Sequence, residues 1–347
     1  MRLVGTGHWL PFVMEPPQHI LLIRLKSIGD ILFTLPAVNR VRTAWPQAKL
    51  VFLVSREHAP LLEGFRDVDA VLTLDRERFR GFQPKAIVQE TLGLWRGLRR
   101  ERFSLTIDFQ GYGETALMTW CSGAPTRWGS VYRSGRQWAY TRGVRRDPGP
   151  HPAEVHLAML EACGVPASPV RNEFILPPGP LELARQFFKD AGLDPARPTL
   201  FLQPFTSAAA KDWPLASYLA VARHWRERGV QVLFGGGPAE RAALEPARQS
   251  GFPVSAGVPM LVTAGLLQLS TIVLGGDTGV LHLAVALGKR VVMLMGSTGP
   301  GSCYPFRHPD WAVVPAERRP VSSIEPAAIN EVCARVLAEL GPSLRGA

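Results

Sequence analysis

The most restrictive feature of this 347-residue sequence is a pattern that occurs twice: short, continuous apolar runs separated by longer amphipathic stretches. Runs in which successive side chains are apolar indicate strands of a parallel sheet that is covered by helices on both faces. The strands expected on this basis are 19–25, 49–55, 70–75 and 105–109, then 199–205, 230–234, 271–274 and 290–295. The sequence therefore predicts two doubly wound α/β domains, as its length also favours.

A proline-rich stretch at residues 166–180 separates the two halves and lacks helical periodicity, which is typical of an interdomain linker. We expect an N-terminal domain at 19–168, a second domain at 176–330, and a C-terminal helix or tail at 331–347. Residues 1–18 are expected to form an extension outside the fold, and Met14 is as plausible a start as Met1. Helices are expected at 29–43 and near 214–228, 238–249, 259–269 and 278–287.

Several classes of protein are excluded at this point. No apolar run approaches the roughly 20 residues that a membrane-spanning helix needs. The four cysteines, Cys121, Cys163, Cys303 and Cys333, stand 30 or more residues apart, so neither a zinc site nor a redox pair is expected. A reducing, cytoplasmic environment fits this cysteine usage best.

The first polar cluster at a strand end lies between the first expected strand and the helix that follows. In the run Lys26-Ser27-Ile28-Gly29-Asp30, Gly29 permits a tight turn and Asp30 opens the helix. Aspartate is favoured in the first turn of helices, because it accepts backbone N–H bonds there. Asp30 therefore has two interpretations: a helix cap, or a carboxylate general base at the cleft between two domains.

Two further clusters follow strands of the second half. The loop 203–214 contains Thr206, Ser207 and Lys211, which suit an anionic group such as a diphosphate, although Pro214 also marks an ordinary helix start. The segment 275–282 contains Asp277, Thr278, Gly279 and His282 and runs from a strand into a helix, whose first N–H groups can bind an anion. His282 is either a packed histidine or a member of this site.

Other common signatures are missing or incomplete. The run Phe234–Pro238 follows a strand, but Glu240 occupies the third-glycine position of a dinucleotide fingerprint. There is no P-loop and no GxSxG motif. The only DxD pattern, Asp67 to Asp69, precedes an expected strand instead of following one, which favours a solvated turn over a metal site. We therefore expect neither a metal nor a cofactor.

Taken together and in this order, these segments resemble the ADP-heptose:lipopolysaccharide heptosyltransferases, glycosyltransferase family 9. The resemblance runs from His19 to about Pro300. The segments that carry it are ILLIRLKSIGDILFTLPAVNRVRTAWPQAKL, the TIDFQG stretch, the TS…KDWP loop, FGGGPAE and GGDTGVLHLAVALGKRVVMLMG.

The resemblance implies a GT-B fold, in which two Rossmann-like domains with parallel sheets face a cleft. The N-terminal domain then binds the acceptor, and the C-terminal domain binds the sugar nucleotide. It implies an inverting, metal-independent transfer of a heptose, or a related sugar, from an ADP-sugar to a lipopolysaccharide core or similar glycolipid. Asp30 then corresponds to the general base, beside Ser27 and Gly29. Lys211, with Thr206 and Ser207, holds the leaving diphosphate and stabilises the negative charge that develops on it in the transition state. Asp277, Thr278, Gly279 and His282 hold the donor's sugar and phosphates, and Glu240 matches the ribose-binding position.

The basic charge of the first half gives an expectation about partners. The net charge of +10 divides into +7 for residues 1–170 and +3 for the rest, which favours an anionic partner on the N-terminal side. An anionic glycolipid at the inner face of the cytoplasmic membrane would fit, and peripheral attachment is expected. The residues on which this expectation depends are Arg76, Arg78, Arg80, Arg96, Arg99, Arg100, Arg102, Arg127, Arg133, Arg136, Trp95, Trp128 and Trp138.

Two alternatives remain. A non-transferase on the same scaffold, either a sugar-nucleotide epimerase or a sugar-binding module, would share the fold. A nucleic-acid-binding function would share only the positive charge, and no recognised motif supports it. The sequence leaves open which sugar is transferred to which acceptor position, the donor nucleotide, and the oligomeric state.

Overall fold

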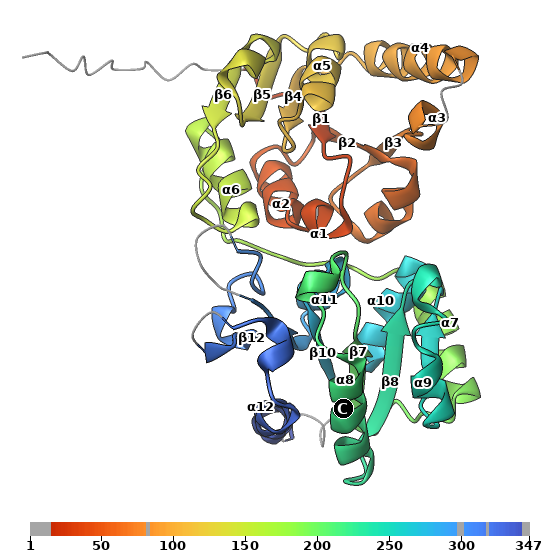
Figure 1. Cartoon of the computed structure of the whole chain (residues 1–347). Helices are drawn as coiled ribbons and strands as arrows, with labels where there is room; N and C mark the ends of the chain where they lie inside the picture. The colour runs from red at the N-terminus through yellow and green to blue at the C-terminus, as the bar shows by residue number, and fades with distance from the viewer. Residues whose placement is uncertain (1–14, 81–83, 297–301, 317–318, 342–347) are drawn as a thin grey trace, which may run out of the picture.

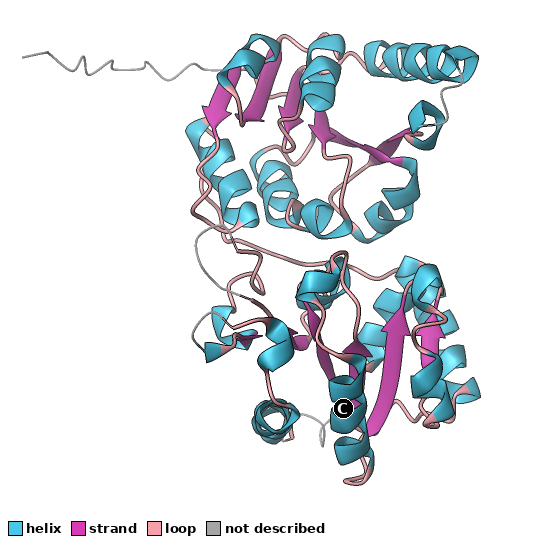
Figure 2. Cartoon of the chain, viewed as in Figure 1, coloured by secondary structure: helices cyan, strands magenta, loops and turns pink. Residues whose placement is uncertain are grey.

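The computed structural model describes residues 15–80, 84–296, 302–316 and 319–341, and it contains two parallel six-stranded sheets (Figures 1 and 2). The first sheet has the strand order β3-β2-β1-β4-β5-β6. Its strands are β1 (His19–Ile23), β2 (Lys49–Ser55), β3 (Ala70–Leu74), β4 (Leu105–Asp108), β5 (Thr126–Val131) and β6 (Arg142–Arg145). The accompanying α-helices are α1 (Ile28–Leu32), α2 (Leu35–Ala44), α3 (Glu77–Arg80), α4 (Pro84–Arg100), α5 (Gly113–Cys121) and α6 (Pro152–Ala162).

The second sheet repeats this architecture with the order β12-β11-β10-β7-β8-β9. Its strands are β7 (Thr199–Gln203), β8 (Gln231–Gly236), β9 (Val254–Ala256), β10 (Ile272–Gly276), β11 (Arg290–Leu294) and β12 (Ala312–Val313). Its helices are α7 (Pro178–Asp190), α8 (Leu215–Arg226), α9 (Glu245–Gln249), α10 (Met260–Leu269), α11 (Gly279–Ala286) and α12 (Pro326–Leu340). The predicted fold class, two doubly wound parallel-sheet domains, is confirmed.

The eight predicted strands all occur, each within two residues of its expected ends. Two helix predictions were wrong in their continuity. The expected helix at 29–43 is divided into α1 and α2 at Phe33 and Thr34, and Pro36 stands in the first turn of α2. Proline cannot donate the helical hydrogen bond, and its ring collides with the preceding turn, so it begins a helix more readily than it continues one. Pro246 has the same position in α9, which is separate from a short 3-10 turn at Pro238–Glu240.

Helices cover both faces of the sheets, and the apolar core does not stop at the domain boundary. A single buried cluster beneath α2 and α6 includes Phe33 and continues through Leu266 and Ala284 of the second domain. In Figure 1, α1 and α11 meet between the two domains. The elements that follow β1 and β10 are therefore brought into contact. None of the helices in the described ranges is long and apolar enough to cross a membrane.

The linker segment is attached to both domains. The Phe174 N–H donates to the carbonyl of Ala286 at 2.8 Å, and the Ile175 N–H donates to the carbonyl of Gly64 at 3.0 Å.

At the other end of the second domain, α12 begins at Pro326, so the boundary expected at residue 330 lies inside this helix. Ile329 and Cys333 of α12 are buried in the core of the second domain.

Candidate active site

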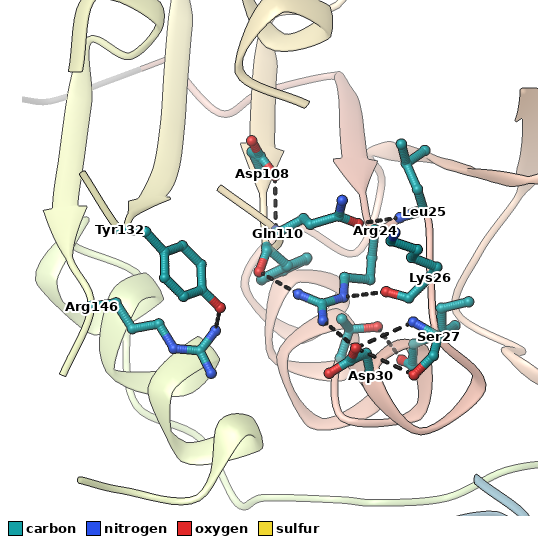
Figure 3. A network of polar contacts seen from close by, with 12 residues as sticks. Arg24, Leu25, Lys26, Ser27, Asp30, Asp108, Gln110, Tyr132 and Arg146 are labelled. Atoms are coloured by element: carbon teal, nitrogen blue, oxygen red, sulfur yellow. Dashed lines mark hydrogen bonds and ion pairs between the residues drawn. The ribbon is translucent and has the colours of Figure 1, made fainter. Parts of the chain in front are cut away.

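The Asp30 carboxylate lies in the first turn of α1, directly beyond the end of β1 (Figure 3). Its Oδ2 atom accepts the Ser27 N–H at 3.2 Å and the Ser27 hydroxyl at 3.3 Å, so Asp30 does cap its helix. The same oxygen is 2.7 Å from Nη2 of Arg24. Oδ1 has no polar contact within the described part of the chain, and the side chain is 39% exposed. Capping by one oxygen therefore leaves the other available to a substrate.

Arg24 holds this carboxylate from a buried position. Its side chain is 5% exposed, and its Nε and Nη1 atoms donate to the carbonyls of Lys26 and Phe109 at 3.0 and 3.2 Å. All three guanidinium nitrogens are thus engaged, two with the backbone and one with Asp30, which fixes the direction of the contact. Sequence reasoning missed Arg24, because an arginine at the end of a strand carries no motif of its own.

The TIDFQG stretch supports the same loop from the neighbouring strand. Gln110 accepts the Leu25 N–H at 2.9 Å, which ties β4 to the residues that lead into α1. Asp108 is fully buried and accepts the Gln110 and Gly111 N–H groups and the Tyr140 hydroxyl. Burial raises the pKa of Asp108, and these hydrogen bonds only partly offset the effect. Asp108 is therefore a buried structural carboxylate.

Arg146, which follows β6, is a second residue that the sequence analysis did not single out for the site. Its guanidinium stacks on Tyr132, 4.6 Å from the ring centroid, and donates to the Tyr132 hydroxyl (Figure 3). Burial lowers the pKa of Arg146, as does the charge of Arg24, whereas Asp30 raises it. A cation therefore lies within electrostatic reach of the candidate base.

On the second domain, the structure brings together three of the residues predicted from sequence. Asp277, just beyond β10, accepts from Lys211 Nζ at 2.7 Å through Oδ2, and its Oδ1 is 3.1 Å from Nε2 of His282. Burial tends to raise the pKa of Asp277, but the contacts with His282 and Lys211 outweigh it and lower the pKa below its usual value. The hydrogen bond to Asp277 in turn raises the pKa of Lys211. The ammonium is half exposed.

The loop 203–214 is held in shape by the hydroxyl of Thr206. The Thr206 Oγ1 atom donates to the Ala208 carbonyl at 2.9 Å and accepts the Ala208 N–H at 3.1 Å, and Asp212 accepts the Thr206 N–H at 2.8 Å. Ser207 is exposed. Beyond the loop, α8 begins at Leu215 directly after Pro214, so the helix-start interpretation of this segment also holds.

The first turn of α11 lies against α1 of the other domain. Thr278 caps α11 by accepting the Leu281 N–H at 3.4 Å. A Cβ atom on Gly279 would stand 2.7 Å from Ile28 Cγ2, and one on Gly29 would stand 3.3 Å from Cδ2 of His282. Glycine at both positions therefore allows the two helices to approach closely. His282 is also packed: it is 5% exposed, and its ring meets Phe33 edge to face at 4.6 Å.

The thiol of Cys303 is influenced by charged side chains of both domains. Burial raises the pKa of this thiol to about 11, as do the charges of Asp277 and Asp30, while Lys211 and Arg146 lower it. One side chain is thus within electrostatic range of the carboxylates of both domains. Burial in this region strengthens such interactions relative to open solvent.

Glu240, the DxD pattern and Trp128 were also named in the sequence analysis, and the structure shows what each of them contacts. Glu240 accepts the Gly237 N–H at 2.7 Å and so caps the turn after β8. Asp69 of the DxD pattern accepts from Arg42 and from the Leu50 N–H, a structural role. Among the described residues, no group of three or more His, Cys, Asp and Glu side chains is arranged to hold a metal ion.

Trp128, expected at a membrane surface, is only 4% exposed and packs near Trp45, so that expectation was wrong.

Comparison with known proteins agrees with this geometry. The family model of glycosyltransferase family 9 (heptosyltransferase) matches residues 91–324, about two thirds of the chain. The lipopolysaccharide core heptosyltransferase OpsX of Haemophilus influenzae is 23% identical over 311 residues, covering 87% of this chain and 85% of that protein. Lipopolysaccharide heptosyltransferase 1 of Pseudomonas aeruginosa is 28% identical over 298 residues, covering 82% and 80%.

The fold is similar to a solved structure as well. The E. coli heptosyltransferase WaaC with ADP-2-deoxy-2-fluoro heptose superimposes with a TM-score of 0.74 at 19% identity, covering 92% of this chain and 99% of that one. The resemblance read from the sequence is confirmed, and the chain belongs to glycosyltransferase family 9 (heptosyltransferase).

Proposed function

We propose that this enzyme transfers a heptose from an ADP-sugar to a lipopolysaccharide core or similar glycolipid acceptor, with inversion and without a metal. The observation that carries the proposal is the contact between α1 and α11, because it brings two clusters from different domains to one region: Asp30 held by Arg24, and Asp277 held by Lys211 and His282. The names of the relatives support the sugar, and the ADP-sugar analogue in the WaaC structure supports the donor.

The reaction follows from where charge and protons must move. The acceptor hydroxyl attacks the anomeric carbon, the bond from that carbon to the diphosphate oxygen breaks, and the hydroxyl proton passes to Asp30. Oδ1 of Asp30 is the atom without a protein partner among the described residues, so it is the proton acceptor in this proposal. Arg24 keeps Oδ2 in place throughout the step.

The leaving diphosphate gains negative charge as the bond breaks. Lys211 is the cation that stabilises this charge, and the first N–H groups of α11 add the partial positive charge of a helix N-terminus. Asp277 keeps the ammonium positioned before the donor arrives, so little reorganisation is needed when the charge develops. Thr206, Ser207 and Glu240 complete the donor side in this proposal, Glu240 toward the ribose.

We also propose that the enzyme works in the cytoplasm, peripherally on the inner face of the cytoplasmic membrane. Trp95 and Trp138 support this location, because they are 46% and 57% exposed on the basic N-terminal domain. Release from membranes by high salt is the expected behaviour, since the attraction between basic side chains and anionic lipid is screened.

The decisive experiment separates transfer from other uses of the same fold. Purified protein is incubated with an ADP-heptose, with and without a heptose-deficient lipopolysaccharide acceptor, and the sugar nucleotide and the acceptor are followed by mass spectrometry. Donor consumption only in the presence of acceptor, with equal gain of acceptor mass, is expected. Conversion of the sugar nucleotide alone would instead indicate an epimerase, and binding without turnover would indicate a sugar-binding module.

A further inference from the structure

An apolar groove of ≈ 640 Å³ lies in the N-terminal domain between α4 and α5. Its buried lining includes Leu74 and Leu98, which are 3% and 1% exposed. Its other lining includes Leu92, Trp95 and Leu117, which remain 42%, 46% and 51% exposed. Pockets of about 300–1,000 Å³ commonly enclose a small ligand. Large side chains exposed on both walls indicate that the groove is open to a hydrophobic occupant.

Positive charge borders this apolar lining. Arg76 lines the groove, and its Nη2 is 3.3 Å from a carboxylate oxygen of Glu114. Arg96, Arg99 and Arg100 are exposed at the C-terminal end of α4, where the Arg99 guanidinium lies 6.0 Å from the ring centroid of Trp95. Apolar walls with an arginine border suit an amphiphile that has a hydrocarbon tail and anionic groups near its head.

One end of the groove is connected to the Asp30 loop. Glu114, in the first turn of α5, accepts from Gln110 Nε2 at 3.1 Å, and Gln110 in turn accepts the Leu25 N–H. A molecule whose tail lies in the groove would therefore have its head near the sheet edge that carries Asp30. This connection distinguishes the groove from an isolated apolar patch elsewhere on the surface.

We propose that the groove between α4 and α5 binds an acyl chain of the glycolipid acceptor; this inference rests on the proposed function. A recessed groove can surround one hydrocarbon chain, whereas a bilayer surface would contact only its outer edges. Arg76, at the Glu114 end of the groove, meets a phosphate of the same lipid, and the acceptor sugar extends toward Asp30. The groove thus contributes acceptor affinity without contacting the reacting atoms.

The test compares two acceptors that carry the same sugars, one acylated and one chemically deacylated, both assayed in the same detergent. Leu117→Asp places a charge on the groove wall at an exposed position that the fold tolerates. We expect this variant to raise KM for the acylated acceptor about tenfold, while KM for the deacylated acceptor and kcat for both stay at the wild-type values. The matched control is Leu183→Asp on α7, 60% exposed and outside the groove, which is expected to change neither KM.

Three results would overturn the inference. The first is an equal rise in KM for both acceptors, or no rise for either. The second is that Leu117→Asp no longer sediments with acceptor-free anionic phospholipid vesicles but keeps the wild-type KM for the acylated acceptor. That result would make the groove a contact with the bilayer. The third is absence of transfer to both acceptors by wild-type protein that still binds the ADP-sugar, which would refute the proposed function and the inference with it.

Discussion

At the residue scale, Asp30 caps its helix and is also the proposed general base, and one substitution can separate these two roles. In Asp30→Asn, the carboxamide oxygen would still accept hydrogen bonds from Ser27, but the side chain could not take a proton. We expect kcat to fall about 10²- to 10⁴-fold, because general-base assistance is lost. The dissociation constant for ADP, measured by calorimetry, and the midpoint of thermal unfolding should change little. An unchanged kcat would leave Asp30 with the capping role alone.

Lys211 provides a second test at this scale. Lys211→Met keeps the length of the side chain and removes its charge, so the diphosphate loses a charge-assisted hydrogen bond. We expect ADP to bind about 10- to 100-fold more weakly in calorimetry. Lys189→Met, at an exposed position in the last turn of α7, is the control and should bind ADP as the wild type does. Equal affinities of the two variants would contradict the assignment of Lys211.

The outcome for individual residues shows what a sequence can reveal about a site. Asp30, Lys211 and Asp277 could be predicted because each follows a recognisable strand, and strand ends of a parallel sheet share one edge. Arg24 and Arg146 could not, since their importance depends on which carbonyls and rings lie around them after folding. Trp128 was assigned to the surface for the same reason: composition does not show which of several tryptophans is buried.

At the element scale, the contact between α1 and α11 brings Asp30, the proposed base, close to Asp277 of the proposed donor site. In Gly279→Ala, the new Cβ would stand 2.7 Å from Ile28 Cγ2 and 3.2 Å from the backbone nitrogen of Gly29, so the two helices must separate. We expect kcat/KM to fall at least tenfold, because small displacements of reacting groups are costly. Gly93→Ala on α4 is the control, since its Cβ would meet nothing within 4 Å. Wild-type activity in Gly279→Ala would show that this approach is dispensable.

The strands that sequence reasoning missed are those without a continuous apolar run. β5 (TRWGSV) and β6 (RGVR) combine arginine and glycine with few apolar residues, and β6 is an edge strand whose residues are partly exposed. β6 needs no continuous apolar run because its residues stay partly exposed, whereas β5 is an inner strand in which Arg127 and Gly129 interrupt the apolar pattern. β9 and β12 contain three and two residues, too few to form a pattern. The inner strands other than β5 carry continuous apolar runs, because both of their faces are buried.

At the scale of the whole molecule, the domains are joined by a shared core and by His151. This histidine precedes α6 and is 2% exposed; its Nδ1 accepts the Ala153 N–H at 3.1 Å. Its Nε2 lies 3.1 Å from the carbonyl of Tyr304, in the segment that follows β11. Its ring also contacts Phe33 and Phe306. A buried imidazole of this kind makes the association of the domains sensitive to acid.

Burial, together with the nearby His282, lowers the pKa of His151 from 6.5 to about 4 in the folded protein. The unfolded chain takes up a proton near pH 6.5, whereas the folded chain does so only near pH 4. The stabilisation is therefore complete above pH 6.5 and is lost as the pH falls toward 4, by about 2 kcal/mol at pH 5. In urea unfolding followed by tryptophan fluorescence, we expect the wild type to lose about 2 kcal/mol more than His151→Gln between pH 7 and pH 5. Equal losses would mean that His151 does not supply this acid sensitivity, and that other groups destabilise the joined domains as the pH falls.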